Sequence, residues 1–175
     1  MKDINNHYIL SRILTKTPEG YAIRFTAEEM EWINAKWAEQ SFLEGHMLNK
    51  DFMSIFAEQI ASEALQEFAE KKKQTYQKGL NTDDLMQAID LMGKSAALTV
   101  GDSSRLYELA ELLEEAGRAA DAKDIYQQFL KEFPEWFEGY QRSLKQMNDE
   151  TATILKTRAE NMRKTAQNKI EYLKK

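Results

Sequence analysis

The chain has 175 residues, a formal net charge of −5, no cysteine, seven glycines and only two prolines. Because there is no cysteine, disulfides, thiolate metal sites and a cysteine nucleophile are excluded, and the net negative charge argues against bulk binding to nucleic acid. The abundance of Ala, Glu, Gln, Lys, Leu and Met predicts a mainly α fold. The length predicts one domain with a small appendage.

Residues 1–26 differ from the rest and are predicted to form an N-terminal β-hairpin appendage. Two short runs rich in Tyr, Ile, Thr and Phe, His7–Thr15 and Tyr21–Thr26, flank a segment that contains Pro18 and Gly20. This segment has turn chemistry, since proline fixes φ and glycine allows a positive φ. An isolated hairpin is marginal in water, so we expect it to pack on the helices or on a partner's sheet.

Residues 27–175 are predicted to form a helical domain, and its first helix carries a start signal. Thr26 is expected as the N-cap, and Glu29 completes a capping box in which each side chain accepts a hydrogen bond from the other residue's backbone N–H. Gly45 is expected to end this helix or to mark a turn.

Two further helices are expected before the loop Leu98–Asp102. The first begins at Asn49 or Asp51 and ends near Gly79, and Thr82 is expected to cap the shorter helix that follows. The apolar residues of the longer helix repeat every four positions, which is typical of a strongly amphipathic helix. They are Phe52, Phe56, Ile60, Ala64 and Phe68.

The next expected helices are Ser103–Glu115 and Ala119–Phe133, separated by a turn at Gly117. Pro134 is expected to end the second of them, because proline lacks a backbone N–H and clashes with the preceding turn. Glu135–Met147 is then predicted as a separate short helix.

The last long helix is predicted at Glu150–Leu173, and it is basic. Residues 156–175 contain seven Lys or Arg and two Glu, a net charge of +5, which leaves −10 on the other 155 residues. Such a helix could bind nucleic acid or acidic lipid, could pair with an acidic surface of this chain or of a partner, or could be a cap with a solvated basic face. We favour the cap, because Glu160 and Glu171 dilute the charge.

The segment Ser103–Trp136 carries a set of small, apolar and turn residues at the spacing of a known helical repeat. Alanines stand where two helices would approach closely, a glycine at the turn and a proline at the end. The positions are Leu106, Leu109, Ala110, Leu113, Gly117, Ala122, Tyr126 and Pro134. The segment resembles a tetratricopeptide repeat, a helix–turn–helix unit of about 34 residues.

The resemblance implies antiparallel helical hairpins stacked as in tetratricopeptide proteins. Residues 102–175 would form the repeat-like unit together with a capping helix. Phe129 stands where the family usually has alanine, which implies altered packing against the following helix. Since one repeat cannot bury its own face, the neighbouring segments must stack on it.

The resemblance also implies protein or peptide binding in a groove lined by the first helix of each pair. By position, the residues of this groove are Ser104, Tyr107, Glu108, Glu111, Glu138, Gln141 and Lys145. Because several are acidic, gripping a peptide's carboxylate is disfavoured, and a partner with a basic or amphipathic segment is favoured. The alternative is that these acids form a solvated face.

No catalytic residue, metal site or cofactor is assigned. The many glutamates read as surface residues of amphipathic helices, and the sequence lacks a phosphate-binding loop, a nucleophile elbow and a helical zinc-protease motif. Glu44 and His46 could supply two metal ligands, but a loop position is favoured for His46. His7 has no partner signal.

These features predict a non-catalytic protein–protein interaction module, such as an adaptor or a secretion-type chaperone. The alternatives are an inhibitor or immunity-type protein of a bacterium or phage that blocks an enzyme, and an enzyme with a carboxylate site among the helices. No run is long enough to span a membrane and no signal peptide is recognised, so we expect a cytoplasmic protein. Secretion without a signal peptide and oligomer formation stay open.

Overall fold

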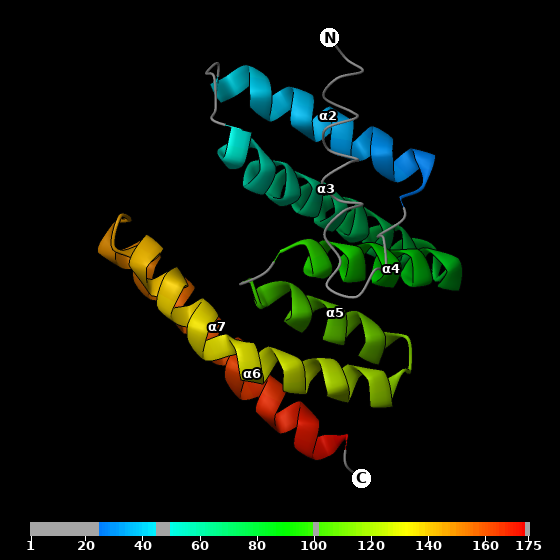
Figure 1. The fold of residues 1–175 in the computed structure, drawn as a ribbon. Coiled ribbons are helices and arrows are strands. Elements are labelled where there is room, and N and C mark those ends of the chain that lie inside the picture. Colours follow the sequence, from blue (N-terminus) through cyan, green and yellow to red (C-terminus); the bar gives the residue numbers. More distant parts are fainter. Residues whose placement is uncertain (1–24, 45–49, 100–101, 174–175) are drawn as a thin grey trace. The chain divides into compact units, whose positions relative to one another are not determined.

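The computed structural model describes residues 25–44, 50–99 and 102–173. In these ranges every regular element is an α-helix, so the predicted mainly α fold is confirmed for them (Figure 1). The predicted β-hairpin lies outside the described residues apart from Phe25 and Thr26, which belong to neither a helix nor a strand.

The chain divides into two compact units, Met1–Thr99 and Val100–Lys175. The sequence predicts one helical domain over 27–175, with 102–175 as its repeat-like part. The second unit begins close to the start of that part, and each unit has its own hydrophobic core.

The described helices of the first unit are α2 (Ala27–Glu44), α3 (Lys50–Gly79) and α4 (Thr82–Leu98). Helix α3 packs against both of the others. The ring of Trp32 on α2 stacks on Phe68 of α3, with centroids 4.9 Å apart. The predicted stripe of α3 is buried where its side chains are described. The buried apolar residues of this unit are Ile33, Trp37, Ile60, Ala61, Ala64, Leu65, Phe68, Ala69, Leu85, Ala88, Ile89, Leu91 and Met92.

Local capping signals fix where the helices of this unit begin. The predicted capping box is confirmed: Glu29 N donates to Thr26 Oγ1 at 3.2 Å, and Thr26 N donates to Glu29 Oε2 at 3.0 Å. The prediction for α4 is wrong by one residue, because Asn81 and not Thr82 is its N-cap. The Asn81 side chain accepts from Asp83 N at 3.1 Å, and asparagine is a stronger cap than threonine.

A buried cluster of hydroxyl groups joins α3 to α4. Ser62 Oγ donates to the carbonyl of Ser95 at 2.7 Å, and Ser95 Oγ donates to the carbonyl of Ser62, also at 2.7 Å. Thr99 Oγ1 donates to the Ser95 carbonyl at 3.1 Å and also lies against Ser62 Oγ. These small side chains let the helices approach closely while each of the three hydroxyls keeps a hydrogen-bond partner.

A partly buried ion pair joins α2 to α4. Lys94 Nζ donates to both carboxylate oxygens of Glu29, at 2.8 and 3.0 Å, and also pairs with Asp90 at 2.8 Å. Burial alone would lower the pKa of Lys94, but the hydrogen bonds to Asp90 and Glu29 outweigh it and raise the pKa above the usual value. Glu29 therefore both caps α2 and anchors it to α4.

The described helices of the second unit are α5 (Ser104–Glu115), α6 (Ala119–Leu144) and α7 (Asp149–Tyr172). Helices α5 and α6 form an antiparallel hairpin (Figure 1). The predicted turn is confirmed: Gly117 has φ +73°, its N–H donates to the carbonyl of Glu114, and Arg118 N donates to that of Leu113. This pair of bonds is a Schellman motif, which glycine permits because it adopts a positive φ without strain.

The prediction that Pro134 ends a helix is wrong, because α6 runs through it to Leu144. The proline removes one backbone hydrogen bond, at a cost of about 3 kcal/mol in a helix interior. Aromatic contacts that span the proline offset this cost, each by about 0.5–1.5 kcal/mol. Phe133 stacks on Phe137 with centroids 5.0 Å apart and meets Trp136 edge-on at 5.5 Å. Figure 1 shows α6 changing direction part-way along its length.

Helix α7 follows the prediction closely. Asn148 caps it by accepting a hydrogen bond from Thr151 N at 2.8 Å. Its predicted apolar stripe faces the unit and packs mainly against α6. Ala159, Ala166 and Ile170 are buried, and Leu155, Met162 and Leu173 are half-buried.

Candidate functional site

The predicted groove residues separate into three environments. Ser104 and Glu108 line a cavity, whereas Tyr107, the residue before Glu108, is only 8% exposed and packs between Tyr126 and Phe129. The others lie near or at the surface. Glu111 is exposed, Glu138 is exposed and pairs with Arg142, Gln141 is half-buried, and Lys145 is the exposed C-cap residue of α6.

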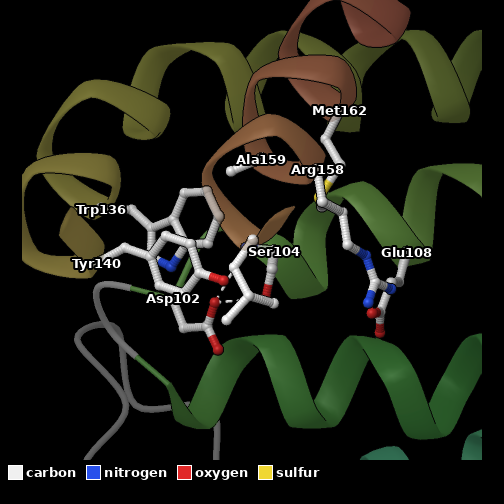
Figure 2. A pocket seen from close by; sticks show the side chains of 9 residues that line it. Asp102, Ser104, Glu108, Trp136, Tyr140, Arg158, Ala159 and Met162 are labelled. Atoms are coloured by element: carbon white, nitrogen blue, oxygen red, sulfur yellow. Dashed lines mark hydrogen bonds between the residues drawn. The ribbon is translucent and has the colours of Figure 1, made fainter. Parts of the chain in front are cut away.

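The cavity has a volume of about 250 Å³ and lies between α5, the second half of α6 and α7. Figure 2 shows its aromatic wall, in which the rings of Trp136 and Tyr140 are stacked. Their centroids are 5.1 Å apart and their planes differ by 14°. Helix α7 supplies the facing wall, which consists of Leu155, Arg158, Ala159 and Met162.

Acidic groups lie at the α5 side of the cavity. Asp102 accepts hydrogen bonds from Ser104 N at 3.1 Å and from Ser104 Oγ at 2.5 Å, and it pairs with Arg105 Nε at 3.4 Å. These bonds fix its carboxylate at the first turn of α5, where the helix dipole favours negative charge. In Figure 2 the side chains of Glu108 and Arg158 point toward one another at the other end of the cavity.

Most of the cavity could not be found from the sequence. The groove prediction names two of its nine lining residues, and it misses Asp102, Trp136, Tyr140 and the four residues of α7. The signals existed separately, since Trp136 and Tyr140 stand one turn apart and the apolar stripe of α7 is readable. The sequence does not show that side chains of α7 lie next to those of α5.

A polar network links the three helices beside the cavity. Tyr126 OH donates to Glu114 Oε2 at 3.2 Å, and Glu114 Oε1 forms an ion pair with Lys169 of α7. Hydrogen-bonding groups of Glu111 and Thr165 flank the hydroxyl of Tyr107. Burial, reinforced by the charge of Glu111, raises the pKa of Tyr107 to about 12. Burial and the charge of Glu114 raise the pKa of Tyr126 still further.

These tyrosines predict an alkaline limit to the stability of the second unit. A tyrosine whose pKa is higher in the folded than in the unfolded state stabilises fully below about pH 10, and this contribution is lost as the pH rises toward the folded value. We expect the unit to lose about 1–2 kcal/mol between pH 9 and pH 11. Urea unfolding followed through Trp136, the one tryptophan of residues 100–175, measures this loss.

The matched variant carries Tyr107→Phe and Tyr126→Phe together, which keeps both rings and removes both hydroxyls. It should start less stable, because Glu114 loses a hydrogen bond, and it should lose much less stability over the same pH interval. An equal pH dependence of the two proteins would contradict the assignment.

The cavity is lined by aromatic, apolar and charged side chains. Among the described residues, no group of three or more His, Asp or Glu side chains is arranged to hold a metal ion. His7 and His46 lie outside those residues, so the structure adds nothing to the alternative metal site at Glu44 and His46. Stacked aromatic rings, a thioether, two carboxylates and a guanidinium can hold an apolar side chain and orient a charged one.

Comparison with known proteins gives no relative for this chain. No protein-family description, no curated protein and no solved structure matches it. Within residues 25–44, 50–99 and 102–173, no helix combines the length and apolarity needed to cross a bilayer.

Proposed function

We propose that this chain is a non-catalytic protein–protein interaction module of the adaptor or chaperone kind, and that its second unit binds a segment of a partner protein in the cavity. The observation that carries the proposal is the cavity itself, a hollow walled by stacked Trp136 and Tyr140 and bordered by Asp102 and Glu108. Aromatic residues are the side chains that most often anchor protein interfaces.

The α5–α6 hairpin supports a tetratricopeptide-like role in the same proposal. Its turn at Gly117 and its buried Ala110 and Ala122 fit the repeat, while Pro134 departs from it by lying inside a helix. We therefore propose one repeat-like hairpin in which the usual second pair is replaced by the end of α6 together with α7.

The size and charge of the cavity indicate what it would hold. Sites for whole small ligands usually span about 300–1,000 Å³, so a cavity of about 250 Å³ suits one or two side chains of a bound segment. Asp102 is already paired with Arg105, and the side chain of Glu108 points toward Arg158 (Figure 2), so the two carboxylates are balanced by two guanidiniums. We therefore expect the segment to place an apolar anchor in the cavity, with a lysine or arginine beside it that replaces Arg158 opposite Glu108.

Selection from a displayed random-peptide library tests the proposal. We expect enriched peptides to carry an apolar residue beside Lys or Arg, and to shift the fluorine resonance of Trp136 in protein labelled with 5-fluorotryptophan. The signals of Trp32 and Trp37 serve as internal references in the same sample.

A matched pair of variants tests whether the peptides bind in the cavity. Glu108→Gln removes a carboxylate from the cavity, and Glu115→Gln removes an exposed one from the same helix. We expect the first to weaken peptide binding about tenfold, as for a charge-assisted hydrogen bond of 1.5–3 kcal/mol, and the second to leave it unchanged. Peptides that bind without moving the Trp136 signal, or that tolerate both variants equally, would refute the cavity as the site.

A further inference from the structure

Two basic residues of α7 contact other helices of the second unit. Lys169 forms an ion pair with Glu114 of α5, and the guanidinium of Arg163 lies over the ring of Phe133 of α6 at 5.6 Å. Thr165 lies beside the hydroxyl of Tyr107. Helix α7 thus covers the side of α5 that carries the predicted groove residues. We call this covered surface, made by Tyr107, Glu114 and Phe133, the α7-covered face, and the exposed Glu111 lies beside it.

The cavity continues the same face. Its α7 residues, from Leu155 to Met162, directly precede Arg163, Thr165 and Lys169 along the helix. The first half of α7 therefore leaves a gap beside α5, and the second half closes the gap. A ligand in the cavity would lie at one end of the surface that α7 occupies.

Helix α7 is held by little large apolar surface. Its buried residues are two alanines and one isoleucine, whereas α6 buries the rings of Tyr126, Phe129 and Phe133. Apolar stabilisation scales with buried area, at about 25 cal/mol per Å², so each alanine contributes far less than an aromatic ring. Ile154, next to the cavity residue Leu155, remains 61% exposed. The half-buried Leu155, Met162 and Leu173 and the polar contacts of Lys169 and Thr165 supply the rest of the hold on α7.

We propose that the α7-covered face is a binding surface for a basic amphipathic helix of a partner protein, and that α7 occupies it in the free chain and is displaced on binding. This rests on the proposed function, since it keeps the cavity residues of α5 and α6 in the partner site, and the partner helix takes the place of the wall that α7 supplies. Charge complementarity indicates a basic partner helix. Glu111 and Glu114 present carboxylates, and in the free chain Lys169 of α7 pairs with Glu114. The partner helix needs small or medium apolar residues three and four positions apart, with a basic residue facing Glu114.

The experiment uses the full chain and a labelled peptide of residues 149–173 as a mimic of the partner helix. Tethering gives α7 an effective concentration of about millimolar, so the peptide should bind the native chain weakly. Lys169→Glu breaks the ion pair and sets two carboxylates against each other. We expect it to speed hydrogen exchange in α7 at least tenfold and to strengthen binding of the native peptide at least fivefold.

Lys164→Glu is the matched control, because it makes the same charge change at an exposed position of α7. It should leave both quantities unchanged. A charge exchange sharpens the test: Glu114→Lys added to Lys169→Glu should restore slow exchange in α7. The protein with Glu114→Lys alone should bind a peptide that carries Lys169→Glu more tightly than it binds the native peptide.

Three other outcomes would contradict the displacement of α7 by a partner helix. Equal exchange and equal peptide binding for Lys169→Glu and Lys164→Glu would overturn the inference. Library peptides that bind in a Glu108-dependent way while α7 stays protected would overturn it and leave the proposed function standing. A concentration-dependent dimer that exchanges α7 would assign the face to a second copy of this chain and overturn the partner. If Lys169→Glu unfolds the unit, Glu114→Gln replaces it, with Glu115→Gln as control.

Discussion

Replacing Phe129 with alanine is expected to lower the free energy of unfolding of the second unit by about 3–5 kcal/mol, the range for removing a buried aromatic ring from a core. The ring is fully buried and meets Tyr107 at 5.4 Å and Phe133 at 5.5 Å, both edge-on. The change is informative because the tetratricopeptide family usually has alanine here. If the resemblance extended to the packing, the family's residue would be tolerated.

Urea unfolding monitored by the fluorine signal of Trp136 measures this effect within the full chain. Gln127→Ala, at an exposed position on the same helix, is the control and should change the stability by less than about 0.5 kcal/mol. A cost near 1 kcal/mol for Phe129→Ala would mean that neighbouring side chains refill the space. The unit would then pack more like a regular repeat than the aromatic contacts indicate.

Replacing Lys94 with methionine is expected to destabilise the first unit by about 2 kcal/mol. Removing one partner of a fully buried ion pair typically costs about 3–5 kcal/mol, because the other charge is left without compensation. Glu29 is 6% exposed and Lys94 is 18% exposed, so water screens part of the loss and we expect the lower figure. The fluorine signals of Trp32 and Trp37 should report a lower urea concentration at the midpoint of unfolding.

Two further variants separate the contacts of Lys94. Asp90→Asn removes its exposed partner and should cost less than about 0.5 kcal/mol, as for most surface ion pairs. Glu29→Gln together with Lys94→Met leaves no unpaired buried charge, since Asp90 is exposed to water, and should recover part of the loss. If Asp90→Asn cost as much as Lys94→Met, the surface pair rather than the buried one would hold α2 to α4.

The basic helix predicted at Glu150–Leu173 had three interpretations, and its contacts bear on all three. Two of its basic residues are engaged within the unit, Lys169 with Glu114 and Arg163 with Phe133. The ion pair offsets the charge of Lys169, whereas Arg163 keeps its charge and remains exposed. These contacts are of the kind expected where a basic helix pairs with an acidic surface of its own chain, and they also suit a capping helix.

The sequence by itself determined the features that depend on neighbouring residues. The capping box of Thr26 and Glu29, the left-handed turn at Gly117 and the buried stripe of α7 were all readable, because caps, turns and apolar spacing act within a few residues. The N-cap of α4 was predicted at Thr82 and lies at Asn81, a one-residue error of the kind expected where two capping residues are adjacent.

Only the tertiary structure decided the features that depend on distant residues. Pro134 carries a strong local stop signal, yet the helix continues because rings on both sides of it pack together. Tyr107 was predicted for an open groove and lies buried, since α6 supplies Tyr126 and Phe129 around it and α7 brings Thr165 to its hydroxyl. The cavity itself exists because α7 packs beside α5, and that pairing joins residues more than 40 positions apart, which no local pattern encodes.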